Sequence, residues 1–253
     1  MKADYKNWVP KGMIYGFGAA AAGLAAAAGV VKNKSLSALF GAGALGCGAW
    51  TAWCLYANSQ FSYDGKRKLS KQIVEGTAEY ITLPEGGVGL DVGCGSGALT
   101  IACAKRNPKG RMVGIDRWGP EYASFCQELC EQNAEAEGVS NVSFQKGDAC
   151  KLDFPDEIFD AVTSNYVYHN ITGKNKGALL RETLRVLKKG GTFAIHDLME
   201  PARYGNMEKF VAELKAEGYE DVQLIRTTNG MFMSPGESKL IMLAGSTLLV
   251  GRK

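Results

Sequence analysis

The stretch GLDVGCGSGALTIACA, residues 89–104, decides the fold that we expect for this chain of 253 residues. Its beginning, together with Val88, suits a buried strand, because apolar side chains recur at every second position up to Val92. The glycines that follow predict a tight turn, and apolar residues then continue at helical spacing from Leu99 to Ala104. A strand that runs through a glycine turn into a helix is typical of open α/β folds.

Strand and helix patterns alternate through the rest of the chain from residue 63 onwards. Such alternation predicts crossover helices and therefore a doubly wound, seven-stranded, mostly parallel sheet with helices on both faces. The predicted strands are 88–92, 111–116, 142–148, 159–165, 191–197, 221–227 and 246–253. Beyond the glycine turn, helices are predicted at 62–81, 120–138, 174–191 and 205–219, the third of them ended by Gly190 and Gly191.

Composition excludes several classes of function. The 29 basic and 26 acidic residues nearly balance and form no long run of one sign, so we expect no nucleic-acid partner. The seven cysteines are scattered without a CxxC pair, which argues against a zinc site or a thioredoxin-like motif. They fit reduced thiols in the cytosol, and we predict no metal site.

The N-terminal 62 residues differ from the rest, because residues 12–31 and 35–63 carry no charge. The first stretch has 20 residues, which as a helix spans about 30 Å, the thickness of a bilayer core. We therefore predict a transmembrane hairpin over residues 1–62, with helices at about 12–31 and 35–58, followed by a globular domain over 63–253. A cleaved signal peptide and a soluble helical pair used for oligomerisation are the alternatives.

The flanks of this hairpin predict its orientation. Aromatic residues gather at the outer end of each helix, as in the aromatic belts of membrane proteins. The outer flanks carry seven Lys or Arg residues, whereas the loop between the helices carries only Lys32 and Lys34. The positive-inside rule then places both termini and the globular domain in the cytoplasm, at the cell membrane.

The glycine turn leaves two cofactors open. GCGSGA fits the G-x-G-x-x-G/A pattern of dinucleotide-binding folds, and Asp116 at the end of the second strand could bind a ribose in either case. Asp91, at the tip of the first strand, would repel a pyrophosphate but attract an ammonium group. S-adenosylmethionine carries an ammonium and a sulfonium and no phosphate, so Asp91 favours it.

With these motifs, residues 63–253 resemble the class I S-adenosylmethionine-dependent methyltransferases. The resemblance implies a Rossmann-like methyltransferase fold whose last strand is antiparallel. It places Asp91 near the methionine amine, Asp116 on the ribose, Asp148 on the adenine amine and Asn165 near the methionine end. The implied cofactor-binding residues are Asp91, Gly93, Gly95, Gly97, Asp116, Arg117, Trp118, Asp148, Ala149 and Asn165. The chain lacks the Asn-Pro-Pro-aromatic motif, which argues against methylation of nucleic-acid bases.

The sequence says less about the methyl acceptor than about the cofactor. If the acceptor is a hydroxyl, a phenol or an acidic carbon, a general base is needed, and the only two histidines, His169 and His196, follow strand ends at the expected cleft. Structural roles for both remain open. Tyr63, Tyr166, Tyr168 and Asp197 are the further substrate-contact candidates. A lipid or quinone-like acceptor, a soluble acceptor, a non-catalytic membrane-tethered S-adenosylmethionine-binding protein and a nicotinamide-dependent oxidoreductase are the hypotheses carried forward.

Overall fold

The computed structural model describes residues 2–119 and 124–253. The chain folds into two compact units. One unit is Lys6–Lys71. The other is Gln72–Lys253 together with the N-terminal segment up to Tyr5. We call Lys2–Tyr5 the N-terminal strap. The sequence boundary near residue 63 thus lies several residues before the structural one, and the strap belongs to the globular unit.

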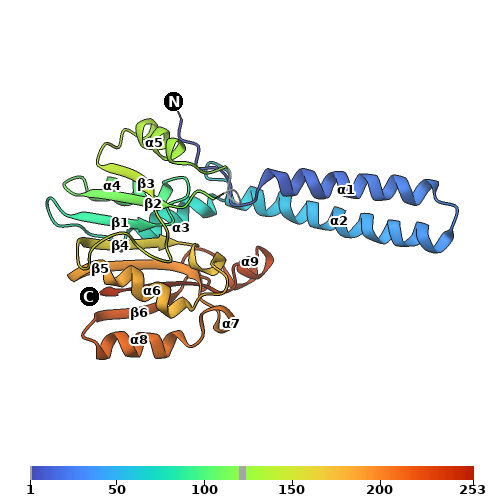
Figure 1. The fold of residues 1–253 in the computed structure, drawn as a ribbon. Coiled ribbons are helices and arrows are strands. Elements are labelled where there is room, and N and C mark those ends of the chain that lie inside the picture. Colours follow the sequence, from blue (N-terminus) through green and yellow to red (C-terminus); the bar gives the residue numbers. More distant parts are fainter. Residues whose placement is uncertain (1, 120–123) are drawn as a thin grey trace. The chain divides into compact units, whose positions relative to one another are not determined.

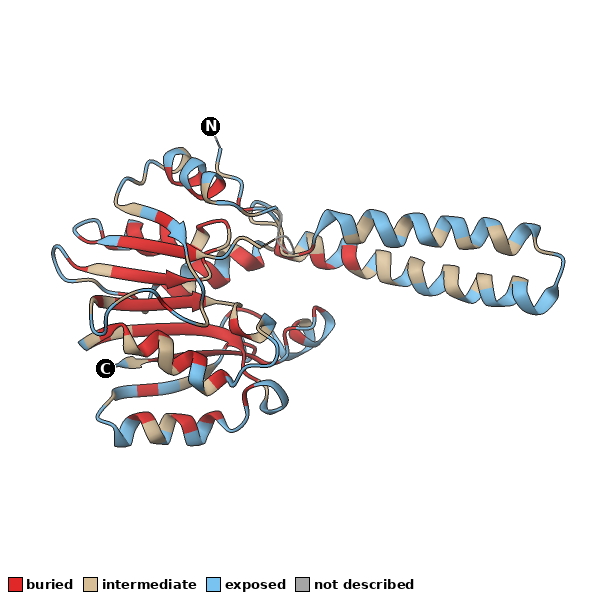
Figure 2. Ribbon diagram, in the orientation of Figure 1, coloured by how far each residue is buried: buried red, intermediate tan, exposed pale blue. Residues whose placement is uncertain are grey.

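The first unit is a helical hairpin made of α1 (Lys11–Val30) and α2 (Lys34–Phe61) (Figure 1). The Ser37 hydroxyl donates to the Ala28 carbonyl at 2.7 Å near the loop. A β-carbon on Gly43 would lie 3.2 Å from the Leu24 side chain, so this glycine lets the helices approach closely. Both helices are long and apolar enough to cross a membrane, and most of their side chains are exposed or half-buried (Figure 2).

The globular unit is built on a seven-stranded sheet in the order β3-β2-β1-β4-β5-β7-β6 (Figure 1). The strands are β1 (Val88–Val92), β2 (Arg111–Asp116), β3 (Val142–Lys146), β4 (Phe159–Asn165), β5 (Leu187–Leu198), β6 (Glu220–Arg226) and β7 (Ser246–Arg252). Strands β1 to β5 are parallel, and β7 runs antiparallel to both β5 and β6. The doubly wound sheet with an antiparallel last strand is confirmed.

The helices and turns of this unit lie between the strands. They are α3 (Leu69–Ala78), which carries the chain out of the hairpin unit, α4 (Ala98–Arg106), α5 (Gln127–Ala136), the 3₁₀ turn η2 (Tyr168–Asn170), α6 (Lys176–Arg185), α7 (Pro201–Tyr204), α8 (Met207–Ala216) and α9 (Pro235–Leu240). The central strands carry the most deeply buried side chains (Figure 2).

Two predicted helices have wrong boundaries. The helix expected at 174–191 ends at Arg185, because the Val186 carbonyl accepts the N–H groups of Ile158 and Phe159 and so begins the β4–β5 pairing. The helix expected at 62–81 begins only at Leu69, after a turn in which Lys68 has a φ of 51°. For the helix expected at 120–138, residues 120–123 lie outside the described part of the chain, and α5 begins at Gln127.

Candidate cofactor and active site

The glycine turn follows β1 and is fixed to the neighbouring strand. The N–H groups of Gly93 and Cys94 both donate to the Ile115 carbonyl of β2, at 2.8 and 2.9 Å. Gly93, Gly95 and Gly97 all have positive φ, a backbone conformation that other residues adopt only with strain. The turn therefore presents its backbone at the carboxyl edge of the sheet, at the entrance to α4.

Two of these glycines differ in what surrounds them. A β-carbon on Gly93 would lie 2.3 Å from Val167 Cγ2, so Gly93 is required by the packing of the segment after β4. At Gly95 the nearest atom would be 3.8 Å away, on Phe125. The space beside Gly95 is therefore open, so a cofactor can approach this turn closely.

Asp116 ties the turn to the end of β2. Its Oδ2 accepts the Gly95 N–H at 2.9 Å, and its Oδ1 accepts the Trp118 N–H at 2.8 Å. The Trp118 indole N–H donates back to the Gly95 carbonyl at 2.9 Å. These contacts place Asp116 and Trp118 beside the open glycine, whereas Arg117 between them is exposed.

Asp91 lies beneath the turn rather than on its surface. Its side chain is almost fully buried, and Oδ2 accepts the Thr100 hydroxyl of α4 at 2.6 Å. Burial raises the pKa of Asp91 to about 7, and the charge of Asp116 adds to this, although the Thr100 bond opposes it. The two carboxyl groups make this end of the sheet favourable for a cation.

The other predicted cofactor residues lie at the same edge. Asp148 follows β3, is exposed, and accepts the Cys150 N–H at 2.8 Å, while Ala149 beside it packs on the core. Asn165 ends β4, with its Oδ1 2.9 Å from His196 Nδ1. The carboxyl ends of β1 to β4 thus gather all ten predicted cofactor residues along one edge.

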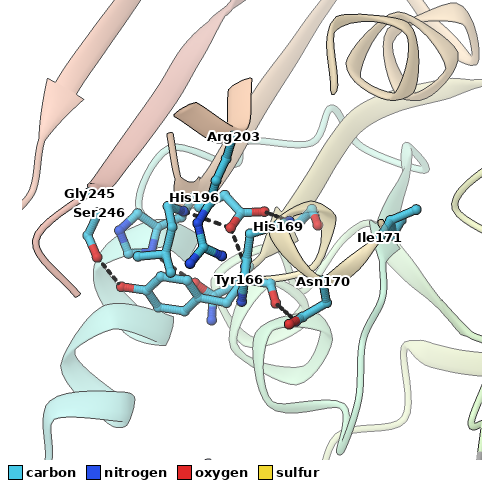
Figure 3. A network of polar contacts seen from close by, with 12 residues as sticks. Tyr166, His169, Asn170, Ile171, His196, Arg203, Gly245 and Ser246 are labelled. Carbon is cyan, nitrogen blue, oxygen red and sulfur yellow. Dashed lines mark hydrogen bonds and ion pairs between the residues drawn. The ribbon is translucent and has the colours of Figure 1, made fainter. Parts of the chain in front are cut away.

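His169, labelled in Figure 3, forms a close pair with Asp197 on this edge. His169 lies in η2, after β4, and Asp197 is at the carboxyl end of β5. His169 Nδ1 is 2.5 Å from Asp197 Oδ1, and the His169 backbone N–H donates to Oδ2 at 3.1 Å. Burial alone would raise the pKa of Asp197, but the interaction with His169 and the hydrogen bonds from Tyr204 and Leu198 together outweigh burial, so the pKa is lowered. Asp197 is therefore a buried carboxylate.

His196 has a different environment. It is fully buried, with Nδ1 2.9 Å from Asn165 Oδ1 and Nε2 2.9 Å from Thr227 Oγ1. Burial lowers its pKa to about 3, so the ring stays neutral. With both nitrogens occupied, His196 fits a structural role, and the geometry favours His169 as the candidate base.

The residues predicted to contact substrate lie in different surroundings in the structure. Tyr166 is half-buried on the edge, with its hydroxyl 2.6 Å from Ser246 Oγ. Tyr168 is fully buried in the core with its hydroxyl 2.5 Å from Thr183 Oγ1, so a substrate contact does not fit its position. Tyr63 lies in the hairpin unit, in the turn after α2, with Lys71 Nζ over its ring.

Several buried polar partners escaped the sequence analysis. Asn133 of α5 is almost fully buried and donates to the Ser96 carbonyl of the turn at 2.9 Å, while its Oδ1 accepts the Asp4 N–H at 2.7 Å. Tyr204 of α7 donates to Asp197 Oδ2 at 2.7 Å. The signal for Asn133 was available, because it follows Leu129 by four residues on the apolar face of a helix. Nothing in the spacing of Tyr204 pointed to Asp197.

Comparison with known proteins agrees with this geometry. Residues 84–232, more than half of the chain, match the model of a methyltransferase domain family. The demethylmenaquinone methyltransferase of Geobacillus stearothermophilus is 28% identical over 72% of this chain and 77% of its own length. The 2-phytyl-1,4-naphtoquinone methyltransferase of Synechococcus elongatus is 38% identical over 44% of this chain, and the chain spans 46% of that relative.

A solved structure shows the same fold. The structure of the phosphoethanolamine N-methyltransferase 2 of Haemonchus contortus in complex with S-adenosyl-L-methionine aligns over 81% of this chain and 57% of that chain, with a TM-score of 0.55 and 17% identity. At this identity the likeness concerns the fold alone. The match to the family model, over a domain with this glycine turn, is the stronger finding: the chain belongs to the methyltransferase domain family, and it is an S-adenosylmethionine-dependent methyltransferase.

Proposed function

We propose that this protein is anchored in the membrane by its hairpin and methylates a lipid-soluble, quinone-like small molecule. The observation that carries the proposal is the combination of an exposed apolar hairpin with relatives named for the methylation of quinones. A quinone with a prenyl tail partitions into the bilayer, so an anchored enzyme works where its acceptor is concentrated. The flanking lysines and arginines of the hairpin support a globular unit on the cytoplasmic side.

The cofactor residues receive roles from their positions. Gly95 leaves space for close approach of the cofactor, Asp116 lies beside it for the ribose hydroxyls, and Asp91 with Asp116 provides negative charge for the amino group. Asp148 and Ala149, after β3, are assigned to the adenine side, and Asn165 to the methionine side. The cofactor supplies a methyl group on a sulfonium sulfur, and these residues bind and orient it.

A reconstituted assay tests the proposed acceptor. We expect the full chain in liposomes to transfer labelled methyl from S-adenosylmethionine to a prenylated naphthohydroquinone, and to transfer much less to a tail-less, water-soluble catechol. Extraction into organic solvent separates the two products. Label found only in the water-soluble product would instead support a soluble acceptor, with the hairpin acting as an anchor alone. Cofactor binding without transfer to either would contradict the proposal.

Membrane anchoring leads to a separate prediction. Leu39 and Leu45 of α2 are exposed, and placing Arg at Leu45, near the middle of the helix, should cost about 2.5–3.5 kcal/mol in a membrane, with a smaller cost at Leu39 nearer the loop. We expect the Leu39→Arg/Leu45→Arg variant to shift from the carbonate-resistant membrane fraction to the soluble or aggregated fraction. Leu240→Arg, at an exposed leucine of α9, is the matched control and should leave fractionation unchanged. A wild-type chain released by carbonate would overturn the anchoring.

A further inference from the structure

We propose that His169, held by Asp197 and Tyr204, removes the proton from an aromatic hydroxyl, so that the acceptor is a phenol or hydroquinol methylated on oxygen. This inference rests on the proposed function, because it specifies the acceptor of the same site. In this proposal His169 is the catalytic base, and Asp197 and Tyr204 are positioning residues.

The surroundings of Asp197 fix one orientation of the imidazole. Four donors meet its carboxylate: the Nδ1–H and backbone N–H of His169, the Tyr204 hydroxyl at 2.7 Å and the Leu198 N–H at 2.7 Å. Burial raises the pKa of Tyr204, so that hydroxyl stays a donor. Since a carboxylate can only accept, the neutral form of the His169 ring carries its proton on Nδ1 and a lone pair on Nε2.

Nε2 of His169 is the ring nitrogen that Asp197 does not occupy. Among the described residues it has no hydrogen-bond partner, and the His169 side chain keeps 15% exposure. Val167, two residues before it, contacts Gly93 of the turn, and the Ser164 hydroxyl bonds to the Val92 carbonyl at 2.7 Å. The segment that carries His169 is thus packed directly against the glycine turn.

The backbone before His169 is held in an uncommon conformation. Tyr166 has a φ of 55°, which is rare for a residue with a large side chain. Its N–H donates to the His196 carbonyl at 2.8 Å, and its hydroxyl meets Ser246. The centroids of the Tyr166 and His169 rings are 6.1 Å apart, and the rings meet edge to face. The strained backbone at Tyr166 thus lies where the Tyr166 ring and the His169 imidazole meet.

A cation stands near the same surface. Arg203 of α7, paired with Glu200 at 3.1 Å, extends toward the edge that carries Tyr166 and His169 (Figure 3). Its side chain is about half exposed. A guanidinium in this position favours the oxyanion that forms when an aromatic hydroxyl loses its proton. The cluster thus offers a base for the proton, a ring for an aromatic acceptor and a cation for the developing charge.

The step balances without a further reactant. The hydroxyl proton moves to His169 Nε2, and the electron pair left on oxygen forms the new bond to the methyl carbon. The sulfur–carbon bond of the donor breaks, and its electron pair stays on sulfur. Asp197 stabilises the imidazolium, which then gives its proton to water.

The test compares acceptors that differ only in the reacting atom: 1-naphthol, 1-naphthalenethiol and 1-naphthylamine. For His169→Gln and Asp197→Asn we expect transfer to 1-naphthol to fall by about 10²–10⁴-fold, whereas transfer to the thiol, which ionises unaided near neutral pH, changes little. Tyr204→Phe should lose a smaller factor. Tyr219→Phe, at a half-buried tyrosine packed on Phe193, is the matched control.

A spectroscopic readout is independent of turnover. Because the chain has only two histidines, ¹⁵N-histidine labelling of the protein in detergent gives two imidazole spin systems, and His169→Gln assigns them. We expect one ring to be in the Nδ1–H form in the wild type and to lose it in Asp197→Asn. If the tautomer is unchanged, or if His169→Gln methylates 1-naphthol at the wild-type rate, the inference is wrong. Transfer to 1-naphthol but not to the prenylated naphthohydroquinone would contradict the proposed function and leave the base intact.

Discussion

In an Asp91→Asn variant, we expect the ligand-free globular unit to become more stable, and more so at pH 8 than at pH 5. The folded protein holds a proton on this buried carboxyl up to about pH 7, whereas the unfolded chain releases it near pH 4. A group whose pKa is raised by folding contributes stability that is complete at low pH and is lost as the pH rises through the folded value. Asparagine carries no such penalty and can still meet the Thr100 hydroxyl.

The expected magnitude follows from the pKa. Between pH 5 and about 7 the stability difference between the variant and the wild type should grow by about 2 kcal/mol. Hydrogen exchange of the β1 and β4 amides in the detergent-solubilised full chain measures it. Asp160→Asn is a control of opposite sign: although burial opposes it, the Lys188 and Val88 bonds lower the pKa of Asp160, so that variant should lose stability at pH 8.

Binding should change in the other direction. If Asp91 is held ionised by the amino group of S-adenosylmethionine, Asp91→Asn should weaken cofactor binding by a factor of ten or more, as calorimetry on the same sample would show. Stability gained and affinity lost together would identify a carboxyl kept for its ligand. Unchanged affinity would limit Asp91 to its contact with α4.

The second large effect concerns Gly93. Gly93→Ala would place a methyl group 2.3 Å from Val167 Cγ2 at a φ of 77°, so both crowding and backbone strain oppose it. We expect the turn to shift and cofactor affinity to fall by at least 100-fold, measured by calorimetry. Shortening the neighbour in Gly93→Ala/Val167→Ala should restore a substantial part of the affinity.

A matched control separates strain from crowding in this experiment. Gly173 has a φ of 68° and open space around it, so Gly173→Ala suffers the strain alone. It should lose about 1 kcal/mol of stability and no affinity. If the double variant recovers nothing, the contact with Val167 is not what the glycine protects.

The sheet could be predicted closely because its signals are local. Strands β1, β2 and β4 match their predicted bounds, since each is a short apolar run closed by a polar or glycine residue. The segment VLKKGG, residues 186–191, was predicted wrongly as the end of a helix, because its place in the sheet depends on hydrogen bonds to the chain at 158–159. The cofactor residues followed from a motif, and family membership decides the choice of cofactor that GCGSGA leaves open.

The active-site partners were harder to predict, for a physical reason. Asp197 meets His169 across 28 residues, and Asn133 meets the strap across 129, so only the folded chain brings them together. His169 and His196 look equivalent in sequence, at neighbouring strand ends, yet one keeps a nitrogen available and the other has both nitrogens occupied in the interior.

The docking of Asp4 on Asn133 has a consequence for biosynthesis. The strap and the hairpin leave the ribosome well before α5. Asp4 of the strap therefore cannot bond to Asn133 until α5 has been made, by which time the hairpin has already emerged. The bond between Asp4 and Asn133 therefore forms only after the hairpin has been synthesised, and a chain whose translation stops before residue 133 would carry a complete hairpin and lack this bond.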